Sequence, residues 1–160
     1  MDVLVALGST VLAIATGSAA AYAISRLRPA FAGPLEAVFL LAALFPPAVL
    51  LVPLFSAARV LQAVDSYWGL ILAHAALNLP LAVWSLASFF RGLPRELEDA
   101  ARIDGFSRLQ FYRRILLPLS APAVAAAAII VFIFSWNEFV IALALMQRDS
   151  MRTVPSGSPC

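Results

Sequence analysis

The hydrophobic and polar positions of this chain separate into long uncharged runs and short charged segments. With histidine counted as neutral, four runs carry almost no ionisable side chain: residues 3–25, 37–58, 66–90 and 119–147, the last interrupted only by Glu138. A helix that crosses a bilayer needs about 20 predominantly apolar residues. Each run reaches that length, so the pattern predicts an all-α fold, a polytopic membrane helix bundle with about four transmembrane helices.

Composition agrees with this prediction and limits the chemistry of the chain. Hydrophobic residues make up 62% of the sequence and charged residues 12%, about half the charge that a soluble domain carries. A single cysteine excludes an internal disulfide and offers no metal cluster. The chain has no lysine and no Gly-x4-Gly-Lys stretch, so we expect it to bind neither ATP nor another cofactor itself.

The basic residues, all of them arginine, predict the orientation of the bundle. They concentrate between the first and second runs and between the third and fourth runs. Arginine close to membrane ends is retained on the cytoplasmic side, so we expect residues 26–34 and 91–118 to be cytoplasmic and the loop near residues 57–66 to be external. Both chain ends are then external, which suggests that the chain is part of a longer protein.

The first two runs differ in their small residues and prolines. The first run is rich in Gly, Ala, Ser and Thr, which allow close helix approach in lipid and predict a helix inside the bundle. Phe45-Pro46-Pro47 in the middle of the second run predicts a kink or a break. Such breaks are tolerated where protein or a water-filled cavity satisfies the backbone. A transport path and an ordinary bundle kink are equally compatible with it.

Polar groups in the last two runs give two further hypotheses. His74 has no titratable partner in its run, so we expect a hydrogen-bonded bundle residue rather than a proton relay. Trp136, Asn137 and Glu138 form a candidate lining of a translocation path, because ionisable groups within a membrane usually face the bundle interior or a cavity. The alternative places Glu138 at the external interface, with Trp136 as its anchor; both remain open.

The charged segment before the fourth run predicts a short helix of about three turns. Pro94 suits the first helical turn, where its missing N–H is not needed. Glu96, Glu98 and Asp99 place negative charge at the positive end of the helix dipole. Gly105 then supplies a left-handed stop.

The predicted helix has a shallow apolar face and is followed by a second helix. At 100° per residue Leu97, Ala100 and Ala101 share one face. Ser107 and Gln110 form a capping-box pattern that restarts the chain as a helix. This two-helix platform suits a coupling surface for a partner protein, and equally an amphipathic hairpin resting on anionic lipid.

The same segment resembles the EAA signature of permease subunits in binding-protein-dependent ABC importers. The family pattern is Glu-Ala-Ala-x3-Gly-x9-Ile-x-Leu-Pro, and every spacing matches, with aspartate in place of the usual glutamate. The matching positions are Asp99, Ala100, Ala101, Gly105, Ile115, Leu117 and Pro118.

Flanking segments are similar to the carbohydrate-type, MalG-like branch of these permeases, over roughly residues 4–154. They include Ala20-Ala21-Tyr22-Ala23, Pro53-Leu54-Phe55, Asp104-Gly105 and Trp136-Asn137-Glu138-Phe139. The resemblance implies that residues 1–155 are a partial transmembrane domain of a bacterial inner-membrane permease, without the flanking helices usual at either end. Residues 156–160 are expected to be a disordered tail.

The resemblance also implies a role for the loop at residues 91–118. In the family it docks on the cytoplasmic ATPase, which binds the ATP, and couples ATPase closure to the permease. The expected coupling residues are Leu97, Glu98, Asp99, Ala100, Ala101, Asp104, Gly105, Ile115, Leu117 and Pro118.

The implied partners are a second permease subunit, ATP-binding subunits, an extracytoplasmic solute-binding protein, a sugar substrate and membrane lipid, with no nucleic acid. Two alternatives are a non-functional permease remnant and a membrane-embedded enzyme. An enzyme would need histidine clustered with carboxylates or a serine nucleophile. The only histidine lies away from most of the carboxylates, so we expect no enzyme and no catalytic residue.

Overall fold

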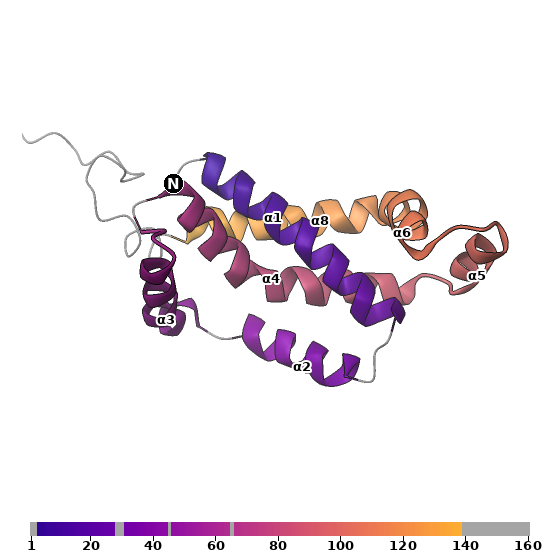
Figure 1. The fold of residues 1–160 in the computed structure, drawn as a ribbon, viewed down its shortest axis with the longest axis horizontal. Coiled ribbons are helices and arrows are strands. Elements are labelled where there is room, and N and C mark those ends of the chain that lie inside the picture. The colour runs from indigo at the N-terminus through magenta and orange to yellow at the C-terminus, as the bar shows by residue number, and fades with distance from the viewer. Residues whose placement is uncertain (1–2, 28–30, 45, 65, 139–160) are drawn as a thin grey trace, which may run out of the picture.

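The computed structural model describes residues 3–27, 31–44, 46–64 and 66–138, and every regular element in these ranges is helical. The bundle is formed by the helices α1 (Val3–Tyr22), α4 (Tyr67–Gly92) and α8 (Ala121–Asn137). α1 continues into a π-helical turn, η1 (Ala23–Leu27). These helices lie side by side along the long axis of the molecule and contact one another (Figure 1). The predicted all-α membrane bundle is therefore confirmed.

The second apolar run forms two short helices, which confirms the break predicted at its prolines. α2 (Ala32–Ala43) lies along α4, whereas α3 (Pro47–Val60) stands crosswise at one end of the bundle (Figure 1). Pro46 occupies the N-cap of α3 with an extended backbone, and Pro47 begins the helix, where a missing N–H costs nothing.

Fewer uninterrupted spans are seen than the four that we predicted. Residues Val3–Leu27 and Tyr67–Gly92 are each long and apolar enough to cross a bilayer. A third candidate is the pair Arg108–Leu119 and Ala121–Asn137, bent by 76°. Residues 139–147 of the fourth apolar run, and the tail at residues 156–160, lie outside the described residues.

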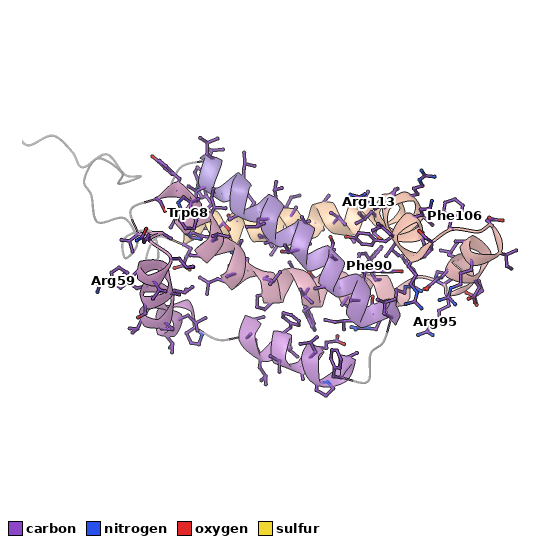
Figure 2. The ribbon with its side chains drawn as sticks, viewed as in Figure 1. Arg59, Trp68, Phe90, Arg95, Phe106 and Arg113 are labelled. Carbon is purple, nitrogen blue, oxygen red and sulfur yellow. The ribbon has the colours of Figure 1, made fainter. Side chains whose placement is uncertain are left out.

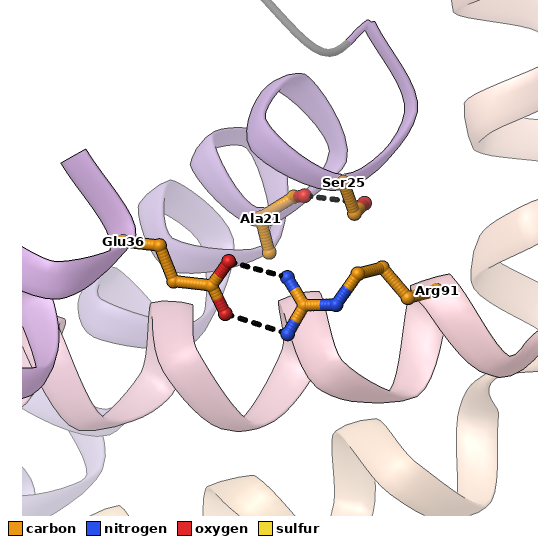
Figure 3. A network of polar contacts seen from close by, with 4 residues as sticks. All are labelled: Ala21, Ser25, Glu36 and Arg91. Carbon is orange, nitrogen blue, oxygen red and sulfur yellow. Dashed lines mark hydrogen bonds and ion pairs between the residues drawn. The ribbon is translucent and has the colours of Figure 1, made fainter. Parts of the chain in front are cut away.

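The interface between α1 and α4 is formed by small residues, as the composition of α1 predicted. Ala13 and Ala21 are fully buried, and a Cβ added at Gly17 would lie 3.0 Å from the Cβ of Ala82. Hydroxyl groups on the same helix donate to its own carbonyls: Ser25 donates to Ala21 at 2.6 Å (Figure 3). Buried hydroxyls satisfied in this way let α1 occupy an apolar interior.

Charged side chains gather at one end of the bundle, where the segments after α1 and α4 both lie. Arg95 and Arg113 are found there with Phe90 and Phe106, whereas Arg59 lies at the opposite end (Figure 2). At the charged end, Arg91 of α4 forms a two-pronged ion pair with Glu36 of α2, at 2.6 and 2.7 Å (Figure 3). This arrangement agrees with the predicted separation of basic and non-basic loops.

Candidate functional site

The loop between α4 and α8 contains four short elements. They are α5 (Glu96–Ile103), α6 (Arg108–Phe111), a π-helical turn η2 (Tyr112–Leu116) and α7 (Leu117–Leu119). α5 has eight residues, about two turns, whereas we predicted about three. Arg95 is the N-cap of α5, so Pro94 lies before the helix and not in its first turn.

Gly105 ends α5 as predicted, with a backbone φ of +79° that disfavours any residue with a side chain. The amide of Gly105 donates to Arg102 at 3.0 Å, and that of Phe106 donates to Ala101 at 2.9 Å. This pair of bonds is a Schellman motif, which reverses the chain and brings Phe106 back against the buried cluster that contains Ala101. Gly105 therefore fixes the angle between α5 and the following helix.

The second helix of the loop starts with the capping box that the sequence predicted. The amide of Gln110 donates to the Ser107 hydroxyl at 3.3 Å, and the Gln110 side chain accepts from the Ser107 amide at 2.8 Å. Two amides that lack helical partners are thereby satisfied. The start of the second helix after Gly105 is therefore determined by residues that are close together in the sequence.

The residues predicted to share one apolar face of α5 point in two different directions. Ala101 is buried in a cluster with Phe90, Phe111 and Leu116, so it packs against the chain's own core. Ala100 instead points outward, beside Ile103, which is 87% exposed. Leu97 lies between these directions and is 36% exposed. The outward surface of α5 therefore centres on Ile103, a residue that the sequence pattern did not identify.

Acidic groups surround the outward apolar surface of α5. Glu96 and Asp99 are exposed, and Asp104 follows them at the C-cap. Glu98 is turned toward the loop and pairs with Arg102 at 2.9 Å. The surface thus combines one protruding aliphatic side chain with exposed carboxylates.

The opposite side of the loop is fastened to α1. The hydroxyls of Ser18 and Tyr112 share a hydrogen bond of 2.7 Å, and the rings of Tyr22 and Tyr112 lie 5.1 Å apart. Beyond them, Arg26 donates to the carbonyl of Leu93, where α4 ends, at 2.9 Å. These contacts connect the loop to the first helix of the bundle.

The last predicted coupling residues lie where the loop turns into α8. Ile115 and Leu117 are half-buried, and Pro118 is exposed. Leu116 between them is buried in the same cluster as Ala101. The structure therefore places Ile115, Leu117 and Pro118 away from the outward surface of α5, in the segment that joins the loop to α8.

A cavity of about 440 Å³ lies where the second apolar run breaks. The last residues of α2, Pro46, and one face of α4 including His74 and Asn78 line it, together with Phe134 and Glu138 of the α8 end. Among the predicted path residues Glu138 therefore reaches the cavity. Trp136 and Asn137 are exposed and are not among its lining residues.

His74 differs from the hydrogen-bonded residue that we predicted. Its side chain is fully buried, yet neither ring nitrogen has a hydrogen-bond partner within the described ranges. Asn78 one turn later donates to the His74 carbonyl at 2.9 Å and to the Ser135 hydroxyl at 3.1 Å. Ser9 of α1 also donates to Ser135, at 3.1 Å. A polar network thus crosses three helices beside the cavity. No group of three potential metal ligands occurs among the described residues.

The loop and the cavity occur in a chain with clear relatives. The family of inner-membrane components of binding-protein-dependent transport systems matches residues 13–157. The chain belongs to this family. It is similar to permeases of the carbohydrate-type, MalG-like branch, and the family consists of transport subunits rather than enzymes.

Similar curated proteins include several permeases named for sugar transport. This chain is 41% identical, over 92% of its length, to the trehalose transport permease SugB of Mycobacterium tuberculosis. It is 40% identical, over 96%, to the sulfoquinovosyl glycerol transport permease SmoH of Agrobacterium fabrum. It is 41% identical, over 92%, to the trehalose/maltose permease MalG of Thermococcus litoralis. These matches cover 53–54% of the relatives, so the permease chain spans about half their length.

A solved structure shares the same architecture. The chain superposes with a TM-score of 0.76 and 25% identity on part of a bacterial ABC transporter involved in the import of the acidic polysaccharide alginate. The match covers 92% of this chain and 51% of the other. The arrangement of helices in Figure 1 is therefore that of an importer permease.

Proposed function

We propose that this permease chain forms half of a sugar translocation path in a bacterial inner membrane and couples it to a cytoplasmic ATPase. In this proposal the chain crosses the membrane several times, and the loop at residues 91–118 is its cytoplasmic contact. The names of the relatives support sugars as the substrate class. The half-length match leaves room for a further part of the permease that completes the path.

One observation carries the coupling proposal: α5 presents an exposed apolar residue outward while its other side is fastened to the bundle. Ile103 is 87% exposed at the far end of the loop, and Ala101 is 3% exposed against the core. Burying a large aliphatic side chain on a partner yields about 1.5–3 kcal/mol. A partner that covers Ile103 and moves would move Tyr112 and α1 with it, because the loop is hydrogen-bonded to α1.

The charges of the loop favour a protein partner over lipid for α5. Glu96 and Asp99 are exposed near Ile103, and like charges repel α5 from an anionic membrane surface. Exposed arginines of α6 and η2, by contrast, suit lipid phosphates; they are Arg108, Arg113 and Arg114. We therefore assign α5 to the ATPase and the α6–η2 segment to the membrane surface.

The remaining components follow from this assignment. The permease chain would pair with a second permease subunit, ATP-binding subunits and an extracytoplasmic solute-binding protein, in contact with membrane lipid and without nucleic acid. It would need no cofactor of its own, because the ATPase subunit binds ATP. A non-functional remnant is the alternative, and it predicts that no ATPase associates with the chain.

The test is co-purification from bacterial membranes after co-expression with the ATP-binding subunits. We expect the native chain to retain the ATPase and Ile103→Glu to lose it, with both inserted at equal levels. Val60→Glu is the matched control, since Val60 is 84% exposed on α3 at the opposite end of the bundle. Equal retention by both variants would contradict docking through α5, and no retention by the native chain would support the remnant.

A further inference from the structure

The segment Arg108–Leu119, which contains α6, η2 and α7, lies almost at right angles to α8. The two helical parts are bent by 76°, so a span that follows the membrane normal leaves Arg108–Leu119 close to the plane of the membrane. Arg114 lies five residues before Leu119, about 8 Å along the helix at 1.5 Å per residue. At this angle the depth changes by only about 2 Å over that distance. Arg114 therefore stays at the level where the span enters the bilayer.

The outward side of this segment combines arginine with exposed aliphatic residues. Arg113 and Arg114 are both exposed. Leu109, one turn before Arg113, is 61% exposed, and Leu119 at the end of the segment is 49% exposed. Basic groups flanked by apolar side chains are typical of helices that lie between lipid headgroups and acyl chains. We call these four residues the interfacial face.

The inward side of the segment fixes the orientation of the interfacial face. Phe111 and Leu116 are buried in the cluster that also contains Ala101. The Tyr112 hydroxyl shares a hydrogen bond of 2.7 Å with Ser18 of α1. Because this side is packed, the segment cannot rotate its arginines toward the protein without breaking these contacts. The interfacial face is therefore preformed for a partner outside the chain.

Neither arginine of the interfacial face has a counter-ion within the part of the chain that the structure describes. The ion pairs found there join Arg91 to Glu36 and Arg102 to Glu98. The exposed carboxylates of the loop belong to α5 and its C-cap, and α5 lies farther from the bundle than α6 (Figure 1). Adjacent guanidinium groups suit phosphate oxygens, and lipid phosphate is the anion found at this depth.

We propose that the interfacial face binds an anionic phospholipid of the cytoplasmic leaflet. Arg113 and Arg114 bind its phosphate, and Leu109 and Leu119 contact its acyl chains. The proposal rests on the proposed function, which puts the loop on the cytoplasmic side, and it names the lipid partner of that loop. The lipid would hold the α6–η2 segment at the membrane while α5 contacts the ATPase.

The test measures which lipid surrounds a tryptophan placed beside the arginines. The full chain carries Trp68→Phe, Trp84→Phe and Trp136→Phe, so that Leu119→Trp is the reporter. Val11→Trp, at a position that is 68% exposed in the middle of α1, is the control reporter. Each chain is reconstituted in vesicles of phosphatidylglycerol and phosphatidylcholine, with bromine on the acyl chains of one lipid at a time. Bromine quenches tryptophan on contact, so the two quenching values give the ratio of phosphatidylglycerol to phosphatidylcholine association.

We expect this association ratio to be higher at Leu119→Trp than at Val11→Trp, and to fall as salt is added. Arg113→Gln and Arg114→Gln should each lower the ratio about fivefold, the effect of one charge near an anionic surface. Arg113→Lys should retain most of the ratio because it keeps the charge. Arg95→Gln is the matched control and should leave the ratio unchanged, since Arg95 is exposed at the same end of the molecule but on the opposite side from Arg113 (Figure 2).

Three results would overturn the lipid surface. The first is an unchanged ratio when Arg113→Gln and Arg114→Gln are combined; if that double variant also loses the ATPase, the arginines belong to the protein interface. The second is an equal loss in Arg95→Gln or in Arg113→Lys, which would exclude a local effect of charge. The third is complete loss of the ratio when glycerol 3-phosphate is added at constant ionic strength, which would indicate a site for soluble phosphate.

The proposed function is judged separately, because its test is retention of the ATPase by the native chain and its loss in Ile103→Glu. Retention without a lipid preference at Leu119→Trp would reject the lipid surface alone. A lipid preference without retention would leave the lipid surface and reject coupling.

Discussion

The hydroxyl groups of Ser18 and Tyr112 lie 2.7 Å apart, although 94 positions separate them in the sequence. Ser18 lies near the C-terminal end of α1, and Tyr112 begins the π-helical turn of the charged loop. Because Tyr22 also lies against the Tyr112 ring, the loop and α1 form one mechanical unit. The loop is therefore joined to α1 by side-chain contacts, in addition to its chain connections to α4 and α8.

Removing the Tyr112 hydroxyl should weaken this connection without creating a cavity. We expect Tyr112→Phe to lower the free energy of unfolding by about 1 kcal/mol, the typical net contribution of a hydrogen bond. Denaturant unfolding in detergent would measure it. Tyr67→Phe is the control, because Tyr67 is 45% exposed and should show little change. If Tyr112→Phe and Ser18→Ala prove fully additive, the two hydroxyls are not coupled.

Gly105 should be intolerant of a side chain because of its backbone and not because of crowding. Its φ is +79°, while nothing lies within 4 Å of the place where a Cβ would be. We expect Gly105→Ala to cost about 1–2 kcal/mol through left-handed strain. Gly92→Ala is a matched control, since Gly92 also has open space and no positive φ. Limited proteolysis of the loop would report the change; equal protection in the two variants would contradict the strain.

The ion pair between Glu36 and Arg91 should contribute modestly to attaching α2 to α4. Both side chains are about one-third exposed, at 28% and 32%, so water and salt screen their attraction. We expect Glu36→Gln to reduce stability by at most about 1 kcal/mol, and by less at high salt. The exchange Glu36→Arg with Arg91→Glu should recover part of the loss. A large effect that is insensitive to salt would contradict this account.

Local signals predicted the elements that depend on neighbouring residues. Gly105, the Ser107–Gln110 capping box and the Pro46 break each follow from backbone chemistry within a few positions. The long apolar runs likewise predicted α1 and α4, because their length matches a bilayer.

Relationships between distant segments could not be predicted in the same way. The helical wheel of α5 grouped Ala100 with Ala101, but only packing against Phe90 and Phe111 decides that Ala101 turns inward. The π-helical turn at Tyr112 changes the angular spacing of side chains, so a 3.6-residue period cannot place the Tyr112 hydroxyl on Ser18. The cavity at His74 requires α2, α4 and the α8 end to meet, which no local pattern reports.

Cysteine cross-linking across α5 tests whether its outward face docks on the ATPase, as we propose. With Cys160→Ser as background, single cysteines at Ala100, Ala101 and Ile103 would be cross-linked in membranes that contain the ATP-binding subunits. We predict cross-links from Ala100→Cys and Ile103→Cys and none from Ala101→Cys, since Ala101 is 3% exposed and Ile103 is 87% exposed. Cross-linking from Ala101→Cys alone, or from none of the three, would contradict the account.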